Sequence, residues 1–321
     1  MNKLALATAI ATALSFASYS SAEGPIDSTI YGKANLSIVN SDNGSTDQWN
    51  LNSNASRLGV KGKTKIGEGL YAIYKAEFEV CIDDGDCKGQ TFSQRNIMAG
   101  VEGSFGTVFA GKHDTPTKLA QSKIDLFNDL EGDIKNTFEG ENRVSNMVAY
   151  TSPSVNGFSG TLAAIPAEGT DVDGDGQNDT GLTDGMSYSL NYSMDNLYLA
   201  IAGDQDVDSQ DLLRIVGQYS VDALKLGLMY QQNEDNSGSK DESGYFISAA
   251  YKVDKITYKA QFGSIEDDVD GDEENTFSLG ADYKISSKTK AYLFYTDNTD
   301  SAIGSSDDED SAFGIGMEYK F

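Results

Sequence analysis

The sequence predicts an all-β fold, a sixteen-stranded antiparallel β-barrel that spans a membrane, and three observations lead to it. Segments of about ten residues alternate between apolar and polar side chains, with the period of two that a β-strand imposes. The connections between these segments are alternately short and long, as in barrels with short turns at one end and long loops at the other. After the N-terminus no segment approaches the roughly 18 uninterrupted apolar residues of a membrane-spanning helix.

Composition and charge agree with this fold. The 321 residues include 33 Gly, 17 Tyr and 14 Phe but only 4 Pro, and the apolar fraction of 39% lies below the roughly 45–50% of soluble domains. The formal net charge of −26 repels phosphate groups, which argues against nucleic acid as a partner. It favours a protein that faces cations or a salty medium.

Residues 1–22 have the pattern of an export signal, which leaves residues 23–321 as the barrel domain. Lys3 supplies the positive start, Leu4 to Phe16 are apolar and small, and Ser20-Ser21-Ala22 offers a cleavage site with small residues. The apolar part is too short for a transmembrane helix. We therefore expect an exported protein.

The predicted strands follow one another without interruption by a second domain. Their ranges are 28–39, 54–65, 70–80, 92–102, 106–113, 142–152, 158–167, 184–194, 196–204, 210–220, 223–232, 242–252, 255–264, 275–285, 289–298 and 311–321. A soluble β-sandwich would show similar alternation, but its strands would be nearer 5–6 residues than the 9–11 of a tilted spanning strand. Charged residues in the middle of the polar faces also suit a water-filled lumen better than a packed core.

The last strand, "AFGIGMEYKF", places Phe313, Ile315, Met317, Tyr319 and Phe321 on one face. An open strand edge in lipid would leave backbone groups without partners. We expect this strand to close the barrel against the first strand, near residues 29–39, with the apolar face toward lipid or a neighbouring subunit.

The sequence resembles the general diffusion porins of Gram-negative outer membranes over the whole mature chain. The segments that carry the resemblance are "SRLGVKGKTKIGEGLYAIYKAEFE", "QRNIMAGVEGSFGTVFAGKHD", "ENRVSNMVAYTSP" and the terminal "GMEYKF". The resemblance implies a homotrimer, passive permeation, and a C-terminal strand that the barrel assembly machinery recognises. It also implies an outer membrane with lipid and lipopolysaccharide as surroundings, and a long third loop folded into the lumen.

The third loop is visible as the longest connection, from Asp114 to Glu141, and it is more apolar than the other loops. Long connections without secondary structure tend to be functional. The resemblance places the acidic side of a pore constriction in "FNDLEGD", which gives Asp129, Glu131 and Asp133 as candidates.

The resemblance also implies a cluster of basic residues on the opposite wall. The matching positions are Arg57, Arg95 and Arg143, to which we add Lys61, on the same face as Arg57, and Lys112. Lumen-facing parity is clear for Arg57 and Arg143, whereas apolar residues follow Arg95 on its own parity. A positive wall facing a negative loop would create a transverse field that orients dipolar solutes. The alternative is that these arginines only form salt bridges with lumen carboxylates.

Two further features lie in the other loops. Cys81 and Cys87 flank "IDDGD", and in an exported protein we expect them to form a disulfide. Asp171, Asp173, Asp175 and Asp179 in "DVDGDGQND" resemble the opening of a calcium loop, although the glutamate that would complete it is absent. Loose attraction of divalent cations, calcium among them, is the alternative, and no cofactor is required.

The sequence therefore predicts a non-enzymatic porin that lets small hydrophilic solutes and ions diffuse across the outer membrane. The acidic loops predict cation preference. The first alternative is a solute-specific channel with a dedicated binding site, and the second is a structural or adhesive barrel with a closed lumen. A catalytic role for the single histidine, His113, would need a strand serine and a polar orienting residue beside it, and we expect a role in the constriction or in the structure instead.

Overall fold

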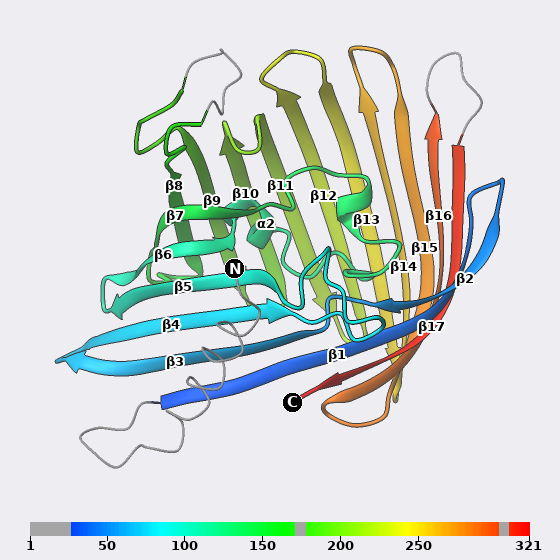
Figure 1. Cartoon of the computed structure of the whole chain (residues 1–321), viewed down its shortest axis with the longest axis horizontal. Coiled ribbons are helices and arrows are strands. Elements are labelled where there is room, and N and C mark those ends of the chain that lie inside the picture. The colour runs from blue at the N-terminus through cyan, green and yellow to red at the C-terminus, as the bar shows by residue number, and fades with distance from the viewer. Residues whose placement is uncertain (1–26, 171–177, 302–307) are drawn as a thin grey trace.

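The computed structural model describes residues 27–170, 178–301 and 308–321, and the regular structure within them is almost entirely β (Figure 1). The proposed signal segment, residues 1–22, lies outside these ranges. In the described parts of the chain, no helix is both long and apolar enough to cross a membrane. The elements are β1 (Asp27–Asp42), β2 (Asp47–Ser53), β3 (Arg57–Gly67), β4 (Leu70–Glu79), β5 (Ser93–Gly103), β6 (Gly106–Asp114), α2 (Pro116–Ala120), η1 (Ile134–Asn136), β7 (Arg143–Thr151), β8 (Phe158–Ile165), β9 (Gly185–Met194), β10 (Leu197–Gln205), β11 (Gln210–Val221), β12 (Leu224–Asp235), β13 (Asp241–Val253), β14 (Ile256–Asp267), β15 (Glu273–Lys284), β16 (Thr289–Ser301) and β17 (Asp308–Lys320).

These strands form a closed sixteen-stranded antiparallel barrel, because β2 and β3 are two halves of one interrupted strand that both pair with β1. At the interruption the Asn54 backbone N–H donates to the Asn35 carbonyl (2.8 Å). The Asn35 N–H in turn donates to Ser56 Oγ (2.9 Å). These two bonds replace ladder bonds that the kink would otherwise lose.

The first outer connection is the main departure from the predicted strands. We expected a long loop over residues 40–53, but β1 continues to Asp42 and β2 begins at Asp47, which leaves only a short turn. Gly44 N–H donates to the Asp42 carboxylate (2.9 Å), and Asn43 Oδ1 accepts from Thr46 N–H (2.8 Å). Polar turn residues thus close a hairpin whose composition is that of a loop.

The barrel closes between its first and last strands, as the sequence predicted. β1 pairs with β17 from Lys33 opposite Lys320 to Asp42 opposite Ser311. Phe321 extends this seam, since Phe321 and Gly32 exchange backbone hydrogen bonds in both directions (3.1 Å each). The apolar side chains of the strand, Phe313, Ile315, Met317, Tyr319 and Phe321, are all exposed on the outer face.

The wall alternates between an apolar outer face and a more polar inner face. On β12, Leu226, Leu228 and Tyr230 are exposed, whereas Met229 and Gln231, on the alternate positions, are buried. Exposed leucines and tyrosines in this pattern are what a lipid-facing surface requires. The large exposed apolar side chains recur on nearly every strand of the barrel.

The third connection, residues 115–142 between β6 and β7, packs its apolar side chains against the inner face of the wall. It begins with α2, where Thr115 Oγ1 caps the helix by accepting from Lys118 N–H (3.2 Å). Its side chains contribute to two buried clusters with inward residues of the wall. One cluster contains Ala120, Ile124, Ile134, Phe138, Met229, Phe246 and Ile265, and the other contains Phe127, Val39, Tyr292 and Phe294.

Three side chains of the third connection pack directly against glycines of the barrel wall, where any larger residue would clash with them. A Cβ atom at Gly227, Gly263 or Gly280 would lie 2.8 Å from Ile124, Phe138 or Phe127, respectively. This is closer than real Cβ contacts, so the three glycines act as sockets on β12, β14 and β15. The third connection is therefore held by shape as well as by polar contacts.

Candidate functional site

Asp129 links the third connection to the wall of the barrel. Its Oδ2 lies 2.6 Å from Lys33 Nζ on β1 and 2.9 Å from Arg57 Nη2 on β3. Burial disfavours the charged carboxylate, but the two cations outweigh that effect and hold the pKa of Asp129 below its usual range. The residue adopts a positive φ of 68°, which is a strained conformation for a non-glycine residue.

Glu77 on β4 is a second carboxylate that Arg57 contacts, besides Asp129, and it is surrounded by cations. Its Oε1 accepts from Arg95 Nε (2.9 Å), and its Oε2 accepts from the Tyr31 hydroxyl (2.8 Å). Arg57 Nη1 lies 3.8 Å away and Lys75 Nζ lies 3.6 Å away. Glu77 and Asp129 together thus tie β1, β3, β4 and β5 to the third connection.

A β-bulge explains why the parity of Arg95 was ambiguous. Ala76 pairs with Ile97 and Phe78 pairs with Gln94, so Arg95 and Asn96 both lie opposite Glu77. The extra residue changes the parity along β5. Arg95 can therefore reach Glu77 while Ile97 keeps to the outer face.

Arg143, at the start of β7, belongs to a separate ion-pair group. Its Nη2 lies 2.8 Å from Asp114 Oδ1, and its Nε donates to Asn96 Oδ1 (2.9 Å). Lys118 of α2 lies 3.7 Å from the same Asp114 oxygen. Arg57, Arg95 and Arg143 are therefore all paired with carboxylates, which is compatible with a basic wall and with the salt-bridge alternative.

The remaining two acidic candidates have different surroundings. Glu131 Oε1 accepts from Asn52 Nδ2 (2.6 Å), and burial raises the pKa of Glu131. Asp133 is only 2% exposed and caps η1, where it accepts from Lys135 N–H (3.1 Å) and from Asp129 N–H (2.7 Å). Asp133 thus fixes the shape of the connection, which corrects the expectation that it lines the aqueous passage.

The two added lysines also lie apart from these ion pairs. Lys61 is on the inward parity of β3, where its Nζ lies 5.3 Å from the Tyr31 ring centre. Lys112 pairs with Ile97 across β5 and β6, and it shares the parity of the exposed Val108 and Ala110. Lys112 therefore faces outward, and the expectation that it belongs to the basic wall is wrong.

Several residues that sequence reasoning did not select complete the network. Lys33, Tyr31 and Glu77 lie on the inward parity of their strands, and that parity was the only signal that could have found them. Arg214 on β11 is fully buried and pairs with Glu141 at the end of the third connection (2.8 Å). Arg214 Nη2 also donates to the Glu139 carbonyl (2.7 Å).

Asp125 is a further buried carboxyl inside the third connection. It accepts from the backbone N–H groups of Phe127 (3.0 Å) and Ile134 (3.4 Å). Burial is the larger cause and repulsion from Asp133 the smaller one, and together they raise the pKa of Asp125 to about 8. The connection therefore contains a carboxyl group that is largely protonated at neutral pH.

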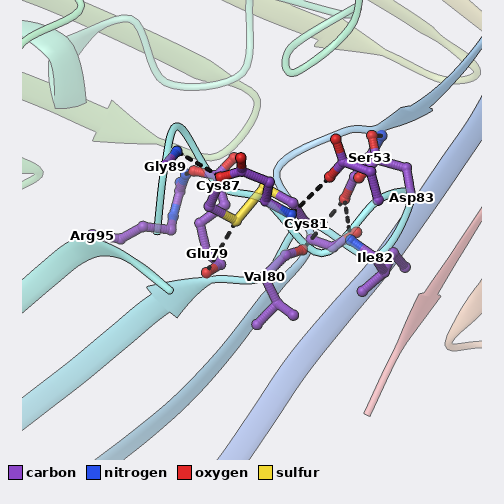
Figure 2. Close-up of a disulfide and its surroundings, with 12 residues drawn as sticks. Ser53, Glu79, Val80, Cys81, Ile82, Asp83, Cys87, Gly89 and Arg95 are labelled. Carbon is purple, nitrogen blue, oxygen red and sulfur yellow. Dashed lines mark hydrogen bonds and ion pairs between the residues drawn. A yellow bond between two sulfur atoms is a disulfide. The ribbon is translucent and has the colours of Figure 1, made fainter. Parts of the chain in front are cut away.

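Cys81 and Cys87 form a disulfide in the loop between β4 and β5, with a Cα–Cα distance of 5.3 Å (Figure 2). Ser53 of β2 ties this loop to the wall, because Ser53 N–H donates to Asp83 Oδ2 (3.2 Å) and Ser53 Oγ donates to the Val80 carbonyl (3.3 Å). The disulfide lies beside Glu79, which Arg95 also contacts at 3.4 Å.

The calcium expectation falls mostly outside the described residues, because Asp171, Asp173 and Asp175 lie in the range 171–177. Asp179 is described, and its backbone exchanges hydrogen bonds with Gly169 and Thr170. Among the described residues there is no group of three or more His, Cys, Asp or Glu side chains placed to hold a metal ion.

A family model described as "Gram-negative porin" matches residues 5–303. Among curated relatives, "Outer membrane porin protein 32" of Delftia acidovorans is 30% identical over 146 residues, which cover 40% of this chain and 41% of the relative. "Major outer membrane protein P.IB" of Neisseria gonorrhoeae is 27% identical over 210 residues, which cover 56% of each protein. The chain thus aligns with less than two thirds of the length of these relatives.

Solved structures show the same fold at low sequence identity. The "Anion-selective porin from Comamonas acidovorans" superposes with a TM-score of 0.77 and 19% identity, covering 92% of this chain and 100% of that one. The trimer form of OmpT of Vibrio cholerae gives a TM-score of 0.70 and 17% identity, covering 92% of this chain and 99% of that one.

Proposed function

This chain belongs to the Gram-negative porin family, and from that premise we propose that it is a water-filled channel for the passive diffusion of small hydrophilic solutes and ions. Members of this family are outer-membrane channels and not enzymes. The observation that carries the proposal is the closed barrel with an apolar outer face and a charged, hydrogen-bonded interior. Such an interior suits a hydrated passage.

The third connection narrows this passage in our proposal. Its two buried clusters and its ion pairs with Lys33, Arg57 and Arg214 hold it against strands from several parts of the barrel. Solutes would pass beside the group of charges around Asp129 and Glu77. Fixed charges of both signs around a narrow aqueous gap favour polar solutes over apolar ones.

Cation preference is the finer part of the proposal, and it rests on the charges of this chain alone. The anion-selective porin from Comamonas acidovorans shares only 19% identity with this chain, which is a likeness of fold. The formal net charge of −26 is concentrated in the outer connections. An acidic entrance raises the local concentration of cations.

Planar-bilayer recording of the purified protein tests the proposal. We expect open-channel conductance, and we expect closure in three equal steps for a homotrimer, the assembly named for the OmpT structure. In a KCl gradient the reversal potential should have the sign of cation preference. Absence of conductance would refute the channel, whereas a reversal potential of the opposite sign would refute only the cation preference.

A further inference from the structure

The charged residues inside the barrel are sorted along its axis, and the strand register shows it. Lys61 lies directly opposite Lys75 in the middle of β3 and β4, on the short-turn side of Arg57. Lys284 lies directly opposite Lys290 beside a short turn. Near the long loops, Glu242 lies directly opposite Asp267, and Glu274 lies directly opposite Asp300. Like charges that face each other across a strand pair destabilise a sheet. The two lysine pairs on the short-turn side and the two acidic pairs near the long loops are therefore costly for the fold.

All four pairs lie on the inward face. Lys61 shares its parity with Arg57, which reaches Asp129, and Lys290 shares its parity with the buried Tyr292 and Phe294. Glu242 and Asp267 are themselves buried on the inner side of the wall. The sorted charges thus act on the lumen and not on the lipid.

Neutralisation at the lysine-rich end is incomplete. Lys63 pairs with Glu102 (2.5 Å), Lys75 contacts Glu77 (3.6 Å) and Lys290 pairs with Asp282 (2.9 Å). In contrast, no carboxylate of the described residues lies within ion-pair distance of Lys61 or Lys65, and both lysines are exposed. Lys61, Lys63 and Lys65 occupy successive inward positions of β3. Together with Lys75, they present a row of ammonium groups to the inner mouth.

We infer that this inner mouth, built around Lys61, Lys63, Lys65 and Lys75, is a binding region for multivalent anions that arrive from the side of the short turns. The ammonium groups are point charges without the fork of a guanidinium, so they favour compact, highly charged oxyanions by charge and not by shape. The inference rests on the proposed channel. It also makes the two entrances of that channel unequal toward anions, because the acidic outer end repels the anions that the inner end attracts.

The test is side-dependent block by inorganic tripolyphosphate in planar bilayers. Ser237 is exposed in the outer connection between β12 and β13, and both described cysteines are in a disulfide. Ser237→Cys therefore adds a thiol that can be labelled with biotin. Streptavidin bound to this biotin identifies the long-loop side of each channel. We expect tripolyphosphate to block from the short-turn side at a concentration about tenfold or more below that needed from the other side. Raising the salt to about 1 M should abolish the difference by screening.

Lys61→Gln/Lys65→Gln removes the two unpaired lysines and should raise the blocking concentration several-fold on the short-turn side only. Lys88→Gln/Lys112→Gln removes the same charge from an outer loop and from the outer face, and it should leave block unchanged. Equal block from both sides, or equal effects of the two double variants, would overturn the inference while leaving the channel intact.

Calorimetric titration of tripolyphosphate into the detergent-solubilised protein provides a readout that does not depend on conductance. We expect binding that weakens in Lys61→Gln/Lys65→Gln and persists in the control. If the protein binds tripolyphosphate in this way but conducts no current, the proposed channel fails and the anion site stands. If binding is absent, the inference fails whatever the conductance.

Discussion

Phe127→Ala tests whether apolar sockets hold the third connection in place. The Phe127 ring is fully buried, and it lies over Gly280, whose Cβ would come within 2.8 Å of it. Lys259 Nζ lies 4.5 Å from the ring centre. Removal of this side chain leaves a cavity between the connection and strands β15 and β16.

The expected cost follows from comparable core deletions. A buried Phe→Ala change costs about 3–5 kcal/mol, and the lost cation–π contact is part of that sum at about 0.5–2 kcal/mol. Since about 1.4 kcal/mol corresponds to a factor of ten, the population of a detached connection should rise by roughly two to three and a half orders of magnitude. The ion pairs of Asp129 and Glu141 remain, so we expect frequent excursions and not permanent release.

Single-channel recording measures this effect. Phe127→Ala should flicker between conductance levels, whereas the parent channel should be quiet. Phe277→Ala is the matched control, because Phe277 lies on the same strand, β15, but is 41% exposed on the outer face. If Phe127→Ala is as quiet as the control, the socket does not hold the connection.

Three other changes have expected outcomes. Glu141→Gln leaves the fully buried Arg214 without its charge partner, and we expect this to destabilise the barrel by about 3–5 kcal/mol. The unfolding temperature, measured on gels of heated samples, should therefore fall. An unchanged unfolding temperature would contradict this. The pKa of Asp125, raised to about 8 by burial, means that the folded state binds more protons than the unfolded state between about pH 4 and 8. Stability should therefore fall as pH rises through this range and level off above it, and Asp125→Asn should flatten that part of the stability–pH curve. Cys81→Ser/Cys87→Ser should lower the free energy of unfolding, measured by denaturant titration, by about 2 kcal/mol. We expect the conductance to stay the same. A changed conductance would show that the loop closed by the disulfide affects the passage.

The sequence alone determined the barrel, its strands and its seam. A period of two assigns every side chain of a regular strand to one face, so Phe313 to Phe321 had to present their apolar side chains outward. The requirement that no backbone edge remains open in lipid then paired β17 with β1. The inward parity of Arg57 followed from the same rule, as did that of Lys61.

Tertiary structure decided what periodicity cannot encode. The bulge opposite Glu77 turned Arg95 inward, and the register with Ile97 turned Lys112 outward, because a single extra residue inverts the faces. The partners of Asp129 come from β1 and β3, nearly a hundred and more than seventy residues earlier in the chain. The burial of Asp133 depends on how the third connection folds back on itself. Local alternation fixes which face a residue occupies, but only barrel closure fixes which charges from distant strands meet across the lumen.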